Sequence, residues 1–198
     1  MTLAWAKSEL ILGGQKSGKS ARAEQLAAAW LAASPDHEAV LIATALAGDS
    51  EMQARIERHR LQRQQRVPAM QTLEEPRRLA QMLTEHSRTH RLLVIDCITL
   101  WLTNLQMPVD ANLPLMSQAE VLIQTDILCQ AIASAPGPVL LISNDIGGGV
   151  IPMGAEVRAF VDTQGLVNQR LASACERLTW RLDGAERCAL GCCTVHLH

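Results

Sequence analysis

Short runs of consecutive apolar residues alternate along the chain with longer stretches that favour helices. Apolar runs of this length, bounded by Gly, Pro or charged residues, predict strands that are buried on both faces. The predicted strands cover residues 10–12, 40–43, 92–95 and 139–142, and the tail adds one or two more, at 178–182 and 193–197.

The stretches between these runs predict helices at residues 20–33, 51–65, 76–86, 117–133 and 155–175, with a loop at 107–116. Strands and helices in this alternation indicate an α/β fold with a mostly parallel central sheet covered by helices on both faces. Ligands bind beyond the carboxyl ends of the strands in such sheets. The residues that directly follow each strand are therefore the candidates for function.

Composition narrows the class of protein. The length of 198 residues predicts a single domain, 1–198, and 48% hydrophobic against 19% charged residues excludes a disordered chain. A net charge of −2 and an aromatic content of 3% give no reason to expect a nucleic-acid partner. No apolar run reaches the roughly 18 residues of a membrane span, and the first residues do not resemble a signal peptide. We therefore expect a cytoplasmic protein with no membrane span.

A phosphate-binding motif follows the first predicted strand and opens the first predicted helix. It fits the pattern G-x-x-x-x-G-K-[ST] at every fixed position. Its members are Gly13, Gly14, Gln15, Lys16, Ser17, Gly18, Lys19 and Ser20. Backbone N–H groups of such a loop surround phosphate oxygens, and the helix start adds partial positive charge. We expect Lys19, on a surface loop, to contact the β- and γ-phosphates of a bound nucleotide.

An acidic residue stands where a second magnesium ligand is needed. Asp96 directly follows the strand predicted at residues 92–95, which is the Walker B position. The hydroxyl of Ser20 and the carboxylate of Asp96 are thus candidate ligands of Mg²⁺, which would accompany GTP or ATP. The alternative is an aspartate that only caps the next helix. Motif and acid together predict a P-loop NTPase fold of the RecA-like kind.

The helix predicted at residues 51–65 is strongly basic. Its arginines, with the one that directly follows it, are Arg55, Arg58, Arg60, Arg63 and Arg66. His59 falls on the stripe of Met52 and Ile56 by its spacing, with Arg60 beside it. A triphosphate would favour such a helix, and a neutral imidazole can attack phosphorus. Taken alone, the pattern is more typical of a solvent-exposed basic face.

The motifs leave several functions open. The Asn-Lys-x-Asp motif by which signalling GTPases read guanine is missing from the sequence, and motor ATPases and helicases are larger. A small transferase that passes a phosphoryl or nucleotidyl group to a small molecule fits best. A simple kinase without a covalent step and a regulatory nucleotide-binding protein remain alternatives. The Cys and His residues of the tail, from 188 onward, favour an ordinary terminal strand over a zinc site, because the usual paired spacing is missing.

Several segments together resemble one family across nearly the whole chain. The P-loop is followed by Ala23-Glu24 and by residues 42–44, and the basic helix contributes residues 51–56 with His59 and Arg60. Residues 96–105, Asp-Cys-Ile-Thr-Leu-Trp-Leu-Thr-Asn-Leu, are the most specific segment. Residues 143–147, 151–152 and 168–172 complete the set in the same order. The chain thus resembles the bifunctional adenosylcobinamide kinase / adenosylcobinamide-phosphate guanylyltransferases of cobalamin biosynthesis.

The resemblance implies two reactions and their residues. ATP or GTP would phosphorylate adenosylcobinamide, and GTP would then transfer GMP to a histidine and on to adenosylcobinamide phosphate. His59 matches the nucleophile position, and Lys19 would serve the kinase step. The flanking Arg55 and Arg60 would hold triphosphate charge. The resemblance also implies a homotrimer.

Overall fold

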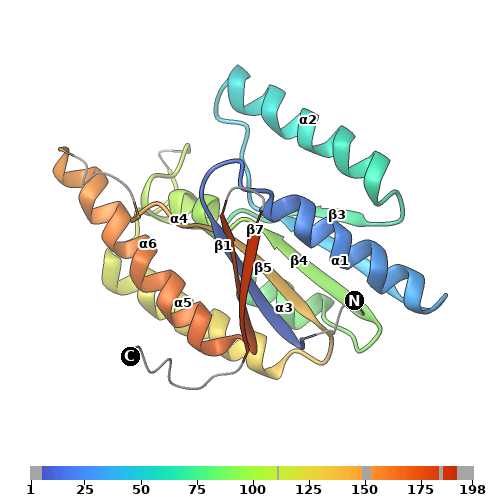
Figure 1. Cartoon of the computed structure of the whole chain (residues 1–198). Helices are drawn as coiled ribbons and strands as arrows, with labels where there is room; N and C mark the ends of the chain where they lie inside the picture. The colour runs from blue at the N-terminus through green and yellow to red at the C-terminus, as the bar shows by residue number, and fades with distance from the viewer. Residues whose placement is uncertain (1–5, 111, 149–152, 183–184, 191–198) are drawn as a thin grey trace.

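The computed structural model describes residues 6–110, 112–148, 153–182 and 185–190. Their strands form one seven-stranded sheet in the order β3-β2-β4-β5-β1-β6-β7 (Figure 1). The strands are β1 (Ser8–Gly13), β2 (Glu38–Ala43), β3 (Gln71–Glu74), β4 (Arg91–Asp96), β5 (Val139–Asn144), β6 (Arg177–Leu182) and β7 (Ala185–Leu190). All pairings are parallel except that of β7 with β6. The predicted mostly parallel α/β sheet is therefore confirmed.

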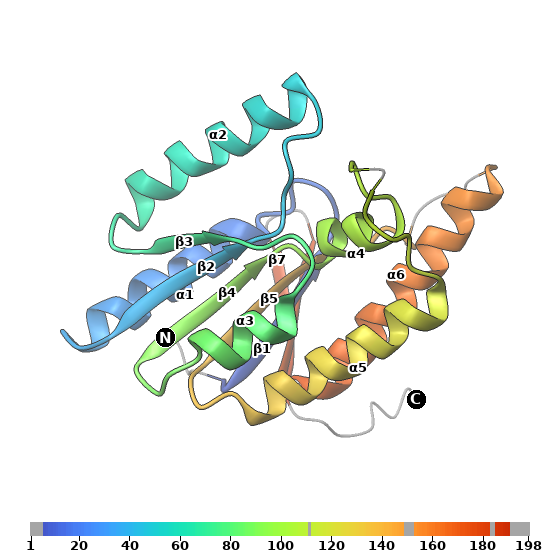
Figure 2. The same ribbon diagram turned by 180° about the vertical axis from the view of Figure 1, so that it is seen from behind.

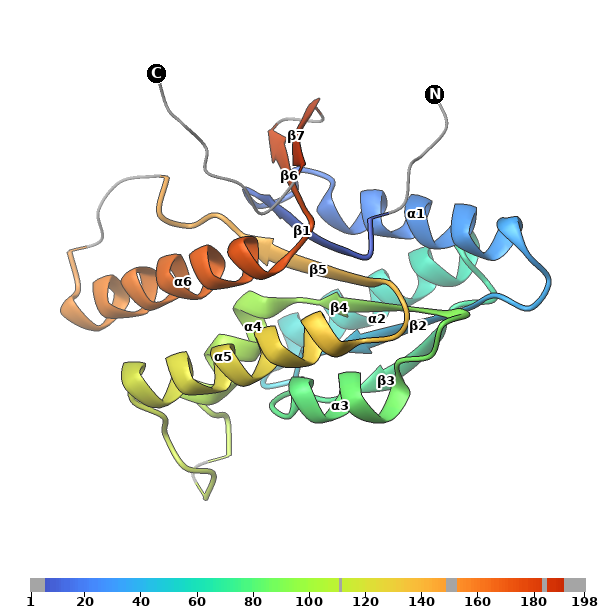
Figure 3. The same ribbon diagram turned by 90° about the horizontal axis from the view of Figure 1, so that it is seen from below.

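Helices cover both faces of this sheet. They are α1 (Lys19–Ala33), α2 (Ser50–Arg66), α3 (Leu79–His86), α4 (Ile98–Gln106), α5 (Gln118–Ser134) and α6 (Ala155–Ala174). Figures 2 and 3 show α3, α5 and α6 on the face opposite α1, while α2 stands apart from the sheet, above α1 in Figure 1 and above β2 and β3 in Figure 2. No helix in the described part of the chain is long and apolar enough to cross a membrane.

The strands bury both faces because successive side chains point to opposite sides. In β4, Leu93 belongs to the core under α3 to α6, whereas Val94 belongs to the core under α1. In β5, Leu141 and Ile142 divide in the same way. Continuous apolar runs, rather than alternating ones, follow directly from this arrangement.

Three elements differ from the sequence prediction. Helix α3 begins at Leu79 rather than at residue 76, because the Glu75 carboxylate accepts the N–H groups of Arg77 and Arg78 at 3.0 Å and holds a separate turn. Strand β3 and helix α4 were not predicted. β3 holds one apolar residue and is fixed by backbone pairing with β2. α4 is buried on most sides, so its apolar residues show little periodicity.

The tail was predicted only in part. Strand β6 matches the strand expected at residues 178–182, and β7 follows it at Ala185–Leu190. The strand expected at 193–197 lies outside the described residues, as do most of the Cys and His residues of the tail.

The core predicts where substitutions will destabilise the protein. Leu141 is 0% exposed in the centre of the sheet, whereas Leu61 on α2 is 51% exposed. We expect Leu141→Ala to lower the free energy of unfolding by about 2–5 kcal/mol, through lost burial and the cavity left behind. Leu61→Ala should change it by less than about 0.5 kcal/mol. Denaturant unfolding of both variants tests this, and similar losses would contradict the core assignment.

Candidate functional site

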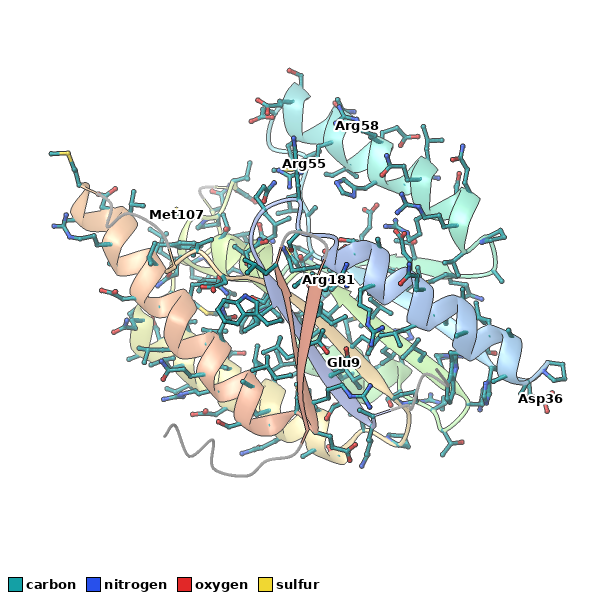
Figure 4. All side chains as sticks on the ribbon, viewed as in Figure 1. Glu9, Asp36, Arg55, Arg58, Met107 and Arg181 are labelled. Carbon is teal, nitrogen blue, oxygen red and sulfur yellow. The ribbon has the colours of Figure 1, made fainter. Side chains whose placement is uncertain are left out.

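The P-loop joins β1 to α1 by a turn that requires glycine at two positions. Gly18 precedes the helix with φ of 90°, a left-handed conformation that strains other residues. At Gly13, an added Cβ would overlap the backbone carbonyl oxygen of Arg181 in β6. Figure 4 shows Arg181 beside the start of α1. Strand β6 therefore packs directly against the start of the P-loop that follows β1.

Lys19 is held inside this loop. Its Nζ donates to the carbonyl oxygens of Gly13, at 2.9 Å, and Gly14, at 2.6 Å. The residue is only 8% exposed, so the expected surface position was wrong: the loop wraps around the ammonium group. Burial lowers the pKa of Lys19, and the electrostatic effects of Cys97 and Asp96 raise it. The loop carbonyls thus hold a cation where the phosphates of a nucleotide are expected.

Asp96 meets Ser20 across the end of the sheet. The Ser20 hydroxyl donates to Asp96 Oδ2 at 3.0 Å. Burial raises the pKa of Asp96, whereas the Ser20 hydrogen bond and the charges of His59 and Arg63 lower it. A hydroxyl and a carboxylate fit Mg²⁺, which takes few protein ligands and completes its octahedron with water and phosphate oxygens. In keeping with such a sparse site, the described residues contain no cluster of three or more His, Cys, Asp or Glu side chains suited to a metal.

Thr44, the residue after β2, forms hydrogen bonds with the segment that follows Asp96. Its hydroxyl accepts the N–H of Cys97 and donates to the Cys97 carbonyl, both at 2.8 Å. Asn104 of α4 donates to the Thr44 carbonyl at 2.7 Å. Burial raises the pKa of Cys97 to about 12, so this thiol is no nucleophile at neutral pH. These bonds fix the backbone directly after Asp96, in the Asp-Cys-Ile-Thr segment, and so orient the Asp96 carboxylate.

A second network fixes the end of β5. Asn168 of α6 donates to the Asn144 carbonyl at 3.1 Å and accepts from the Ser143 hydroxyl at 2.7 Å. Thr99 accepts the N–H of Asn144 at 3.0 Å. The N–H of Asp145 in turn donates to the Gly13 carbonyl at 3.1 Å. The loop after β5 is thereby tied to the P-loop.

Helix α2 carries His59 toward this edge of the sheet. Asp49 caps the helix by accepting the N–H of Met52 at 2.7 Å. His59 is exposed and lies one helical turn before Arg63, which lines a pocket together with Asp96. A small pocket beneath the helix is lined by Ser20, Asp96 and Arg63, with Glu24 and apolar residues around them.

The arginines of α2 divide between two sides. Arg66 donates to Glu24 of α1 at 2.8 Å, and Arg63 lines the pocket. Arg60 instead lies 4.0 Å from Glu57, with a side chain 62% exposed. In Figure 4, Arg55 lies on the side of α2 toward the P-loop and Arg58 on the outer side.

The structure thus brings together Lys19, Ser20, Asp96 and the loop glycines, with His59 facing them. Gln15 and Lys16 are exposed at the loop tip, whereas Ser17 is buried. The sequence prediction did not single out Arg63 or Glu24. The signal was available, because Arg63 follows His59 by four residues and Glu24 follows Ser20 by four.

A P-loop at the end of β1, an acid at the end of β4, and β5 between these two strands define a RecA-like P-loop nucleotide-binding protein, as predicted. Within that class, residues 9–187 match the family described as cobinamide kinase / cobinamide phosphate guanyltransferase. The chain belongs to this family.

Named relatives agree with the family match. The bifunctional adenosylcobalamin biosynthesis protein CobP of Pseudomonas aeruginosa is 43% identical over 178 residues, which cover 89% of this chain and 93% of the relative. The proteins CobU of Escherichia coli and Salmonella typhimurium are 31% and 32% identical over 182 residues, 88% of this chain and 95% of each relative. Among solved structures, the flagellar accessory protein FlaH of Methanocaldococcus jannaschii covers 92% of this chain and 76% of its own, at a TM-score of 0.48 and 12% identity. That likeness is too slight to add to the topology above.

The Thr44 bridge gives a stability prediction. Thr44 is 0% exposed, and Thr44→Val removes both hydroxyl bonds while leaving the Cys97 backbone groups buried. The Cys97 carbonyl still accepts the N–H of Trp101 at 3.1 Å, but the Cys97 N–H loses its acceptor. We expect a loss of about 1–3 kcal/mol in the free energy of unfolding, the cost of a buried donor without a partner. Thr44→Ser keeps the hydroxyl and should lose clearly less. Equal losses in denaturant unfolding would show that the methyl group, not the bridge, stabilises this site.

Proposed function

We propose that the chain phosphorylates adenosylcobinamide with ATP or GTP and then transfers GMP from GTP to the product through a histidine–GMP intermediate. The observation that carries the proposal is the pair of Ser20 and Asp96 in a pocket that is also lined by Arg63, one turn after His59 on the same face of α2. Membership of the family supports both substrates. The loop and the imidazole supply the two kinds of group that these reactions need.

The kinase step uses the P-loop. Lys19, already held among carbonyl oxygens, would contact the β- and γ-phosphate oxygens, and the loop N–H groups would surround them. Ser20 and Asp96 would hold Mg²⁺, which supplies charge neutralisation at the phosphates. The substrate hydroxyl oxygen attacks the γ-phosphorus and loses its proton to water, the bond to the β-phosphate oxygen breaks, and the nucleoside diphosphate leaves.

The guanylyl step uses His59. A neutral imidazole nitrogen attacks the α-phosphorus of GTP, a P–N bond forms, and the P–O bond to the β-phosphate breaks to release pyrophosphate. A phosphate oxygen of adenosylcobinamide phosphate then attacks the same phosphorus and the P–N bond breaks. Two transfers replace one harder displacement. Arg55 and Arg63 would stabilise the charge that develops on the triphosphate. Arg60, which the resemblance also implied, is exposed beside Glu57.

Assembly and location belong to the same proposal. A homotrimer is supported by the family resemblance and by Ile123 and Ile127, exposed one turn apart on α5. A cytoplasmic location is supported by Cys97, Cys129 and Cys175, which are free thiols. The charge of −2 supports small-molecule partners rather than nucleic acid.

Asp96→Asn tests the metal role. Asn keeps an oxygen that accepts from Ser20 but has no charge, so we expect half-saturation of kinase activity to need at least ~10-fold more Mg²⁺. The raised pKa of Asp96 means that ionisation opposes folding at neutral pH, so the neutral variant should be no less stable. A Mg²⁺ titration of the kinase rate and a thermal melt measure both. Asp126→Asn, on α5, is the control, and a wild-type Mg²⁺ dependence in Asp96→Asn would reduce Asp96 to a helix cap.

His59→Ala tests the covalent step. With α-labelled GTP, the wild type should retain label as a bond that is labile in acid and stable in base, as expected of a P–N bond. The variant should retain none and should still phosphorylate adenosylcobinamide, because phosphoryl transfer relies on Lys19, Ser20 and Mg²⁺.

His90→Ala is the matched control and should label fully. Equal label on His59→Ala would move the nucleophile to another histidine. A wild type that phosphorylates the substrate without taking label would favour a simple kinase.

A further inference from the structure

Helix α2 meets the rest of the protein through a short, partly buried row made of Met52, Ile56 and Arg63. None of its residues, all of which the structure describes, is fully buried, although Val67 directly after it is in the core. A surface helix normally buries an apolar stripe, and that stripe fixes its rotation about its own axis. Here the apolar stripe is limited to two half-buried residues in the N-terminal half, so charged contacts must fix the rotation of the C-terminal half of α2.

The ion pair of Arg66 and Glu24 supplies one fixed point. Arg66 Nη1 lies 2.8 Å from Glu24 Oε2, and the Glu24 side chain is 11% exposed against 53% for Arg66. A hydrogen-bonded pair with one partner buried is stronger than the usual exposed pair. Glu24 stands on α1, a rigid element that also carries Ser20. The C-terminal turn of α2 is thus fastened to the helix that follows the P-loop.

Arg63 adds a second point one turn earlier. Burial lowers the pKa of Arg63, and the negative charges of Asp96 and Glu24 oppose that effect. Arg63 lines one small pocket together with these two carboxylates, Asp96 of β4 and Glu24 of α1. Opposite charges alternate from Arg66 through Glu24 and Arg63 to Asp96.

His59, Arg63 and Arg66 share one face of α2. Their spacing of i, i+4 and i+7 places them in a single row along the helix. Any rotation that keeps Arg66 on Glu24 also keeps His59 on the side of the pocket that Arg63, Ser20 and Asp96 line at the strand ends. A turn of the helix by one residue, about 100°, would aim the imidazole at solvent.

We propose that Glu24 and Arg66 are positioning residues for His59: their ion pair, with Arg63, sets the rotation of α2 that presents the imidazole to the nucleotide. The inference rests on the proposed function, since it concerns the same histidine. Arg66 touches neither phosphate nor metal in this scheme, so its loss affects the guanylyl step and spares the kinase step.

Arg66→Gln in the full-length chain is the first test, with the single-turnover rate of GMP attachment from α-labelled GTP as the readout. We expect a fall of about 10-fold or more, because small misplacements of a reacting group are costly. The rate of adenosylcobinamide phosphorylation should stay at its wild-type value. Arg66→Lys should recover part of the attachment rate. Arg58→Gln removes an arginine from the outer side of the same helix and should change nothing.

A double-variant cycle tests the pair itself. Glu24→Gln should slow GMP attachment as Arg66→Gln does, and the double variant should be no slower than either, because each single change already removes the contact. Added salt should slow attachment in the wild type and have a much smaller effect in Arg66→Gln.

The outcomes separate this inference from the proposed function. Full-rate labelling of Arg66→Gln, beside a labelled wild type, would overturn the positioning role and leave the His59 step standing. Equal loss of both activities would also overturn it, since that pattern marks a general structural defect. A wild type that takes no label would overturn the His59 step and the inference with it.

Discussion

The hydrogen bond of 3.0 Å between Ser20, in the first turn of α1 after β1, and Asp96, at the end of β4, links parts of the sheet that are not neighbours. The arrangement of the strands makes this bond possible. β5 lies between β1 and β4, with Gly13 opposite Asn144 and Asp96 opposite Ile142. A slip of one residue in either register would turn Asp96 to the other face of the sheet. The two buried cores prevent such a slip, because it would expose every apolar side chain of the strand.

Two different forces hold the two halves of the site. The P-loop, Asp96 and Thr44 are fixed by buried hydrogen bonds and close backbone contact, which leave little freedom. His59 stands on a helix with no buried residue, oriented by charges at its surface. This difference between the two halves fits the chemistry. The triphosphate needs a rigid binding loop, whereas the nucleophile must reach the phosphorus and then present a bulky adduct to a second substrate.

The sequence predicted the parts of the fold that follow from local rules. Continuous apolar strands, the glycine turn before Lys19 and the acid after β4 each have a local physical cause, and all were found where expected. Strand β3 was missed because backbone pairing, which leaves no trace in side-chain type, holds its residues. The burial of Lys19 was missed because it depends on how the loop wraps its own lysine.

The partners of the α2 arginines could not be predicted from the sequence either. Five arginines in one helix look alike in sequence, and only the position of Glu24 on a neighbouring helix separates Arg66 from Arg60. Charge pairing between elements depends on their relative placement, which single-residue patterns do not encode. Helical spacing from His59 was the one local signal that could have distinguished Arg63.

The contact between Gly13 and the carbonyl of Arg181 also determines when the phosphate site can form during synthesis of the chain. The strand that begins the nucleotide loop is flanked on one side by β6, which leaves the ribosome long after β1. Until β6 emerges, β1 has an open edge and an incomplete core. A nascent chain therefore cannot complete its phosphate site before α6 and β6 have been made, so nucleotide cannot serve as a template for the earlier folding steps.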